Sequence, residues 1–188
     1  IFNFLRLILF TGLRVNEACN LKWKNINLED KPQEFKHPHM VVYGLKGDRD
    51  QTKNYCQVIP ITDYLASILN YQKKLSGNTS QWVFPSNNGK DALNGDDSKP
   101  MSNPTKNIRK IAQEIGHPFS LHDLRHLFAS ITLSLGYTED TIKQLLNHGI
   151  GSITQRYLHQ ITSESYDVYN NIHEGMLKIW EIDFFDDK

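Results

Sequence analysis

Apolar residues recur at three- and four-residue intervals over most of the chain, which is the period of helices that bury one face. The pattern predicts helices at residues 1–10, 14–23, 62–75, 104–115, 120–135, 138–147 and 154–180, the last in two pieces. Thr62, Ser120 and Thr138 stand at predicted helix starts, where a hydroxyl can accept a hydrogen bond from a backbone N–H. The chain is therefore expected to be mainly helical.

Two short stretches depart from this helical period. Residues 40–43 and 57–61 are predicted strands, and a polar segment rich in Gly, Asp and Lys separates them. An antiparallel hairpin with a long turn is expected, whereas the composition of residues 86–102 predicts a long exposed loop. The expected fold is one domain over residues 1–188, mainly α with a small antiparallel β-sheet (α+β).

Length and composition fit a soluble globular protein. With 188 residues, of which 39% are hydrophobic and 22% charged, the chain can bury a core without disulfides. Cys19 and Cys56 are far apart, so they predict neither a disulfide framework nor a metal site and fit a reducing cytoplasm. The apolar opening at residues 1–10 contains Arg6 and is too short to span a bilayer. Because the chain begins abruptly in a helical pattern without Met, we expect a preceding N-terminal portion.

The formal net charge of zero argues mildly against a nucleic-acid partner, because such proteins usually displace counterions with a cationic excess. From Met176 onward there are four acids and two lysines, which leaves 19 basic and 17 acidic residues in 1–175. If the chain binds DNA, its cations must therefore gather on one face, or another segment must supply more of them.

Two segments place an arginine where a phosphate can bind. His122 and Arg125 lie one turn apart near a helix start, where free N–H groups attract anions and the planar Arg fork matches two phosphate oxygens. Arg14 stands at another predicted helix start, three residues before Glu17. The alternatives are a capping His with a solvated Arg, and a surface pair of Arg14 with Glu17.

Further along the chain, His148 closes a predicted helix and Tyr157 follows nine residues later. Taken alone, His148 predicts a C-terminal cap and Tyr157 a half-buried aromatic. The segment beyond, with Ile172, Met176, Ile179 and Trp180 at helical spacing, is suited either to a neighbouring protomer or to its own domain.

In this order, the segments resemble the catalytic domain of tyrosine recombinases, the phage-type integrases. The matching boxes are 11–17 (Thr-Gly-Leu-Arg-Val-Asn-Glu), 122–125 (His-Asp-Leu-Arg), 146–148 (Leu-Asn-His) and Tyr157, with a lysine in the hairpin. The resemblance implies a DNA breaking-and-rejoining fold and a site-specific recombinase, an integrase of a mobile element. Double-stranded DNA would be its partner, bound by a homotetramer, and an isolated domain would be monomeric. The missing N-terminal part would be a helical DNA-binding domain.

The resemblance also implies the role of each residue. Arg14 and Arg125 would bind the scissile phosphate, His122 and His148 would donate hydrogen bonds to it, and Tyr157 would form a 3′-phosphotyrosyl link. No metal or cofactor would be needed, because the arginines neutralise the charge.

The general-acid lysine is the least defined of these positions. Lys53 matches the Thr-Lys context and the distance to the second strand, and Lys46, in a Lys-Gly context, is the alternative. Two residues depart from the family pattern, since Asn147 stands where Gly is usual and Ile153 where Thr is frequent. Tyr166 and Tyr169 are rival nucleophiles, but they lie at the wrong distance from His148.

Three other functions compete with this interpretation. The i, i+4 pair His122 and His126, with His148, has the spacing of a zinc site, although Arg125 between them would repel the ion. A non-catalytic DNA-binding module would share the fold, and a type IB topoisomerase would share the chemistry. The presence of all the expected reactive groups argues against the first of these two, and His122 with the compact spacing argues against the second.

Overall fold

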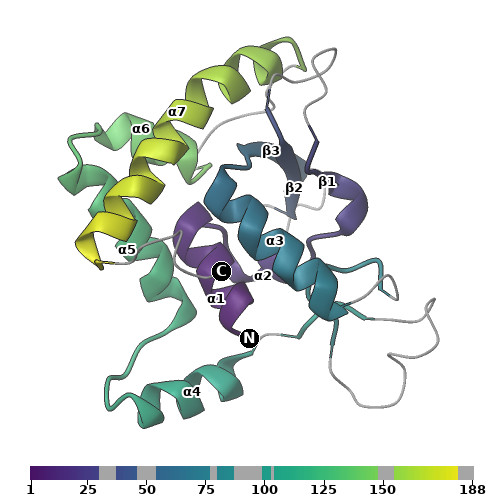
Figure 1. The fold of residues 1–188 in the computed structure, drawn as a ribbon, viewed down its shortest axis with the longest axis vertical. Coiled ribbons are helices and arrows are strands. Elements are labelled where there is room, and N and C mark those ends of the chain that lie inside the picture. The colour runs from purple at the N-terminus through teal and green to yellow at the C-terminus, as the bar shows by residue number, and fades with distance from the viewer. Residues whose placement is uncertain are drawn as a thin grey trace. The chain divides into compact units, whose positions relative to one another are not determined.

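The computed structural model describes residues 1–29, 37–45, 54–76, 80–86, 99–102, 104–147 and 155–181; for 44–45, 54–55 and 155–164 it describes the backbone alone. Its helices are α1 (Phe2–Thr11), α2 (Val15–Cys19), the 3-10 helix η1 (Trp23–Asn25), α3 (Asp63–Ser76), α4 (Thr105–Glu114), α5 (Leu121–Ser134), α6 (Glu139–Leu145) and α7 (Gln155–Ile179) (Figure 1). Its strands are β1 (Ile26–Asn27), β2 (His39–Leu45) and β3 (Asn54–Pro60). The expected mainly helical fold with a small antiparallel sheet is confirmed.

Two of the expected helices differ from those observed. The helix predicted at 14–23 ends at Cys19, because Leu21 and Trp23 enter an extended segment that exchanges backbone hydrogen bonds with residues 81–83. The two predicted C-terminal pieces form one helix, α7, whose sequence contains no proline to interrupt the backbone ladder. Backbone pairing with residues 81–83 therefore makes α2 shorter than predicted, and the absence of proline makes α7 one helix in place of two.

The three predicted N-caps are confirmed. Each hydroxyl accepts a backbone N–H three residues on: Thr62 from Leu65 at 3.4 Å, Ser120 from Asp123 at 3.3 Å, and Thr138 from Thr141 at 3.2 Å. These contacts satisfy donors that the first turn of a helix leaves without an intrahelical partner.

The chain divides into two compact units, with boundaries inside α3 and α5. Unit 1 comprises residues 1–25 and 68–128, and unit 2 comprises residues 26–67 and 129–188. The expectation of a single domain over residues 1–188 stays a prediction. Each unit has its own buried apolar residues.

Unit 1 is organised around α1. Phe4, Leu7 and Ile8 are fully buried, and the Phe4 ring meets Phe84 edge to face at 5.2 Å between centroids. Burying each such side chain contributes about 1.5–3 kcal/mol relative to exposure. α1 is therefore a fixed support for the turn that follows it.

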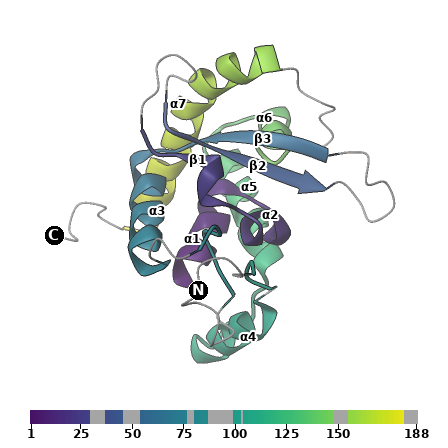
Figure 2. The ribbon, with the colours of Figure 1, turned by 90° about the vertical axis from the view of Figure 1, so that its right-hand side faces the viewer.

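Unit 2 contains the sheet, ordered β1-β2-β3 and antiparallel throughout, with β2 and β3 side by side in Figure 2. Met40 of β2 is paired with Ile26 on one side and Ile59 on the other. α7 packs against β3 and buries Tyr169, Ile172 and Met176. Packing within the chain itself is thereby confirmed for Ile172 and Met176, whereas Ile179 is 54% exposed.

Among the helices of the described segments, none is both long and apolar enough to cross a membrane.

Candidate active site

The turn between α1 and α2 places Arg14 at the start of a helix. Gly12 follows α1 with φ of 66°, a left-handed conformation that glycine adopts without steric cost. Its N–H donates to the Ile8 carbonyl at 2.8 Å, and the Leu13 N–H donates to Thr11 Oγ1 at 3.3 Å. These contacts define the chain direction after α1 and leave Arg14 as the N-cap residue of α2.

Glu17 fixes Arg14 at both its backbone and its side chain. Glu17 Oε2 accepts the Arg14 backbone N–H at 2.7 Å, and Oε1 lies 2.9 Å from Arg14 Nη1. The Glu17 side chain is 4% exposed and that of Arg14 is 43% exposed. The carboxylate is therefore buried while the guanidinium is partly open to solvent, which differs from the alternative of a surface pair. A buried carboxylate restricts the orientation of the guanidinium, which favours an arginine presented to a phosphate.

Arg125 of α5 reaches the same turn. Its side chain is buried, and Nη1 donates a hydrogen bond to the carbonyl oxygen of Gly12, two residues before Arg14. Unit 1 therefore brings the predicted boxes at 11–17 and 122–125 together, although the bonded pair lies 113 positions apart in the sequence. Sequence analysis missed this contact with Gly12, and no local signal predicts it, because a backbone carbonyl has no residue-specific signature.

Two reciprocal hydrogen bonds between Ser120 and Asp123 cap the start of α5. The Ser120 N–H donates to Asp123 Oδ2 at 2.8 Å while Asp123's own N–H donates to Ser120 Oγ, and His122 between them is exposed. The hydrogen bonds from Ser120 lower the pKa of the Asp123 carboxyl, and His126 and His122 add to the effect. The predicted Ser-x-x-Asp capping box is confirmed, and it fixes the backbone that carries His122.

A pH titration tests this capping box. Because the folded-state pKa of Asp123 is depressed, its contribution to stability is present at neutral pH and is lost as pH falls through that pKa. We expect the difference in unfolding free energy between the wild type and Asp123→Asn to shrink progressively below about pH 5. Denaturant unfolding at a series of pH values measures it. A difference that stays constant down to the acid limit would contradict the assignment.

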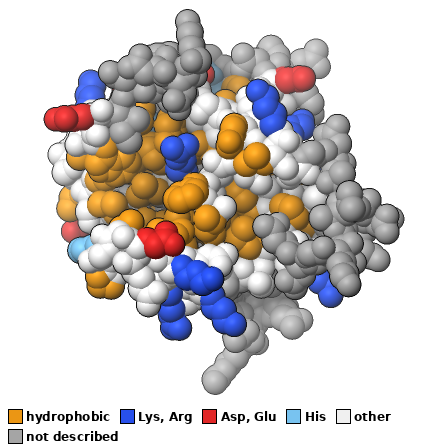
Figure 3. Space-filling view, turned by 60° about the horizontal axis from the view of Figure 1, so that its bottom comes forward, with side chains coloured by type: hydrophobic (Ala, Val, Ile, Leu, Met, Phe, Trp, Pro, Cys, Tyr) orange, Lys and Arg blue, Asp and Glu red, His pale blue; other side chains and the backbone are white. Residues whose placement is uncertain are grey.

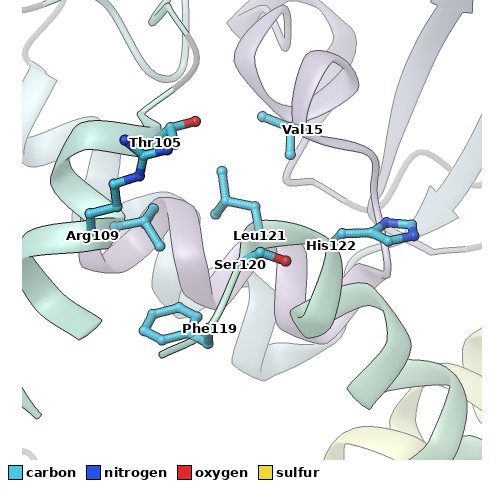
Figure 4. Close-up of a pocket in the computed structure, with 8 residues that line it drawn as sticks. Val15, Thr105, Arg109, Phe119, Ser120, Leu121 and His122 are labelled. Carbon is cyan, nitrogen blue, oxygen red and sulfur yellow. The ribbon is translucent and has the colours of Figure 1, made fainter. Parts of the chain in front are cut away.

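A hollow of about 360 Å³ lies beside His122 within unit 1. Its lining comes from the starts of α2, α4 and α5: Val15, Thr105, Ile108, Arg109, Phe119, Ser120, Leu121 and His122. In Figure 4 Arg109 and Thr105 border one side, and the His122 ring points away from Arg109. Lys106 and Lys110 of the same helix as Arg109 are also exposed. A cationic helix therefore borders the predicted phosphate seat.

Comparison with known proteins decides the family. The model of the phage integrase family matches residues 2–164, which is most of the chain. The chain belongs to the phage integrase family. Among curated relatives, tyrosine recombinase XerA of Pyrococcus furiosus is 33% identical over 156 residues, 80% of this chain and 47% of the relative. XerA of Pyrococcus horikoshii is 31% identical over 155 residues, 81% of this chain and 48% of the relative. The chain spans about half the length of these relatives.

Solved structures show the same fold. The integrase from mycobacterium phage Brujita has a TM-score of 0.58 at 21% identity, covering 91% of this chain and 50% of its own. XerH site-specific recombinase, in a post-cleavage complex with a palindromic difH substrate, has a TM-score of 0.54 at 21% identity, covering 95% of this chain and 45% of its own. These likenesses establish the tyrosine recombinase catalytic fold.

Several residues of the integrase pattern fall outside the described residues. Lys46, Lys53, His148 and Ile153 are not among them, so the choice between the two lysines stays open and both stay predictions. Tyr157 lies in the first turn of α7, where the structure describes the backbone alone. The roles of all these residues stay predictions.

The two rival tyrosines both lie further along α7. Tyr166 stacks on His37 with ring centroids 4.1 Å apart, and Tyr169 is buried to 1% exposure. Stacking and burial each give these rings a packing role in unit 2. Both observations agree with the sequence argument for Tyr157.

The backbone conformation of Asn147 explains why asparagine can stand where glycine is usual in this family. It follows α6 with φ of 50°, in the left-handed region that glycine and, less readily, asparagine adopt. Its N–H donates to the Gln144 carbonyl at 3.0 Å, which closes the helix just before His148. Among the described atoms, its buried Nδ2 has no hydrogen-bond partner.

Replacing Asn147 by glycine is therefore expected to raise the unfolding free energy by about 1 kcal/mol, because strain and a buried unpaired donor both disappear. Asn147→Ala, which keeps a Cβ at positive φ, is expected to be about 1–2 kcal/mol less stable than the glycine variant. Denaturant unfolding of the pair measures the difference. Equal stabilities would show that the backbone here does not require a left-handed residue.

The zinc alternative receives no support from the described residues, which contain no group of three or more His, Cys, Asp or Glu able to hold a metal. The His122 and His126 rings meet edge to face at 4.3 Å between centroids. His148, the third ligand of that hypothesis, lies outside the described segments, so metal independence stays a prediction for this chain.

Proposed function

We propose that this chain is the catalytic part of a site-specific recombinase that cleaves and rejoins DNA through Tyr157. The observation that carries the proposal is the meeting of Arg14 and Arg125 at one glycine turn, with His122 one helical turn before Arg125. Two oriented guanidinium groups beside a helix start form a seat for a phosphodiester.

In the proposed reaction, Arg14 and Arg125 bind the non-bridging oxygens of the scissile phosphate, and His122 and His148 donate hydrogen bonds to it. Tyr157 gives its proton to a base such as His148, its oxygen attacks phosphorus, the bond to the 5′-oxygen breaks, and Lys53, or Lys46, protonates that leaving oxygen. The products are a 3′-phosphotyrosyl link and a free 5′-hydroxyl. Attack by a second 5′-hydroxyl reverses these steps and releases Tyr157, so rejoining needs no external energy source.

The nucleophile needs its cationic surroundings. A phenol has a pKa of about 10, so an unassisted tyrosine is mostly protonated at neutral pH and is a weak nucleophile. A base such as His148, together with the arginine charges, lowers the cost of forming the phenolate. The same charges replace the metal ions that other phosphoryl-transfer sites use.

The distribution of charge supports DNA as the partner. Unit 1 has twelve Lys and Arg against six Asp and Glu, a formal charge of +6, and unit 2 has nine against fifteen, a formal charge of −6. The chain's net charge of zero is therefore the sum of a cationic unit and an anionic unit. The cationic unit is the one that contains Arg14, Arg125 and α4, and Figure 3 shows Lys and Arg side chains projecting from the face that carries α4.

Salt dependence tests the role of α4. Replacing Lys106 and Lys110 by Gln removes two exposed cations and is expected to lower the slope of log Kd against log salt concentration by about 0.9 for each phosphate that the variant no longer neutralises. The matched control is Lys143→Gln in α6, whose cation already lies 3.2 Å from Asp140. Equal salt slopes for the wild type, the α4 variant and the α6 variant would show that Lys106 and Lys110 do not contact DNA.

The finer role we propose is integration or excision of a mobile element. The long hairpin turn of the sequence supports it, as do the structural likenesses to integrases of a phage and of the Tn1549 transposon. On DNA we propose a homotetramer, with an N-terminal DNA-binding domain closing around the duplex and the isolated chain monomeric. Relaxation of any supercoiled DNA without a preferred site would instead favour the topoisomerase alternative.

Covalent trapping tests the proposed function. Full-length protein is incubated in EDTA with a nicked duplex from the ends of its own element, where loss of the short downstream strand prevents rejoining. We expect a protein–DNA band that survives denaturation and EDTA. DNA that is bound but never joined to protein would instead favour the non-catalytic module, and an EDTA-sensitive product would restore the metal hypothesis.

A further inference from the structure

We propose that Thr62 and His173 are positioning residues for the cleavage step, because their buried hydrogen bond fixes α7, and with it Tyr157, against the end of β3. This inference rests on the proposed function, since it concerns the placement of the proposed nucleophile. Neither residue belongs to the motif boxes.

The contact joins three elements of unit 2. Thr62 follows β3 by two residues and caps α3, and its Oγ1 lies 2.8 Å from His173 Nδ1 of α7. The same Oγ1 accepts the Leu65 N–H at 3.4 Å, so the hydroxyl can donate to the imidazole while it accepts from the backbone. Both side chains are 1% exposed.

The surroundings of this hydrogen bond are apolar and aromatic. The His173 ring lies 5.8 Å from the Tyr169 ring and 6.4 Å from the Tyr64 ring, between centroids, and Ile172 and Met176 beside it are fully buried. An apolar interface tolerates small sliding and rotation of a helix, because dispersion contacts have little directionality. A buried hydrogen bond is directional, and it is costly to break where water cannot replace it. His173 therefore selects one axial and rotational position for α7.

The position of α7 reaches the nucleophile because the helix is continuous from Gln155 to Ile179. Tyr157 is sixteen residues before His173, roughly 24 Å along the axis at 1.5 Å per residue. A tilt of the helix at His173 is therefore enlarged at Tyr157.

β3 supports a second reactive segment as well. Gln57 Nε2 donates to the Leu145 carbonyl at 2.5 Å, which holds the end of α6 three residues before His148. The same strand leads back to the hairpin turn that carries Lys53 in the sequence. β3 is thus a common support for the histidine box and, through Thr62 and His173, for the nucleophile helix.

Thr62 offers a matched pair of variants. Thr62→Val removes the hydroxyl with little change of volume, and Thr62→Ser keeps it. With full-length protein at saturating nicked substrate, we expect Thr62→Val to cleave about 10- to 100-fold more slowly in single turnover, because misplacement by an ångström can cost that much. Thr62→Ser should stay within about threefold of the wild type, and the DNA Kd of both variants within about twofold.

A substrate with sulfur at the bridging 5′ position identifies the segment that has moved. A thiolate leaves without protonation, so this substrate restores a rate lost through a displaced general acid but not one lost through a displaced nucleophile. We expect no restoration in Thr62→Val. Wild-type cleavage by Thr62→Val, restoration by the sulfur substrate, or a parallel loss of DNA binding would each overturn the proposal.

If Thr62→Val does not fold, His173→Asn, which keeps a polar atom near the place of Nδ1, and His173→Leu give the same comparison. A wild-type protein that forms no adduct overturns the proposed function itself.

Discussion

Replacing Tyr157 with Phe is expected to abolish the covalent protein–DNA adduct and to leave DNA binding unchanged. The substitution removes the oxygen that we propose attacks phosphorus and changes nothing else at this position in the first turn of α7. Loss of an attacking group lowers the rate by at least about 10⁴-fold. Denaturing gels of the nicked-substrate reaction measure adduct, and gel shifts under native conditions measure binding.

Tyr166→Phe is the matched control, since it makes the same chemical change nine residues later on the same helix. Its ring stacks on His37, and Phe preserves that contact, so adduct formation should continue at near the wild-type rate. Adduct in the Tyr157 variant, or its disappearance in the Tyr166 variant, would place the nucleophile elsewhere.

Arg125→Ala is expected to produce the second large effect, a fall in cleavage rate of about 10³-fold or more at saturating DNA. In the proposed reaction the guanidinium neutralises charge that develops on the phosphate, and groups in this role contribute such factors. Its removal also deprives the buried Gly12 carbonyl of its donor and should destabilise the fold by about 1–3 kcal/mol. Single-turnover cleavage and denaturant unfolding separate the two effects.

Arg125→Lys is the control that keeps a positive charge but loses the planar fork. We expect its DNA binding to match the wild type and its cleavage rate to lie between those of the wild type and the alanine variant. Cleavage by Arg125→Ala within about tenfold of the wild type, in protein shown to be folded, would contradict a phosphate-binding role.

Local chemistry was predictable from the sequence. The caps at Thr62, Ser120 and Thr138 lie where hydroxyl residues precede apolar periodicity. Helices α1, α4 and α5 each end one or two residues before a glycine, and α6 ends two residues before Asn147. The boxes around Arg14 and Arg125 were recognisable because both stand at helix starts. Each box consists of residues close together in the sequence, so its pattern can be read without the fold.

Contacts between distant segments were not predictable in this way. Arg125 with Gly12, Thr62 with His173 and Gln57 with Leu145 join residues 113, 111 and 88 positions apart. Two involve a backbone carbonyl, and none leaves a periodic trace in the sequence. The burial of Glu17 was also missed, because an Arg-x-x-Glu spacing describes a pair equally well inside or outside a core.

Locating the DNA on the trapped protein identifies the nucleophile without any substitution. Trypsin cuts after Arg156 and Lys178, so the trapped adduct should yield the peptide 157–178, which contains Tyr157, Tyr166 and Tyr169. Fragmentation of this peptide by mass spectrometry, after nuclease digestion of the DNA, assigns the modified residue. We expect a 3′-linked nucleotide on Tyr157 alone. A nucleotide on Tyr166, on Tyr169 or on another peptide would contradict it.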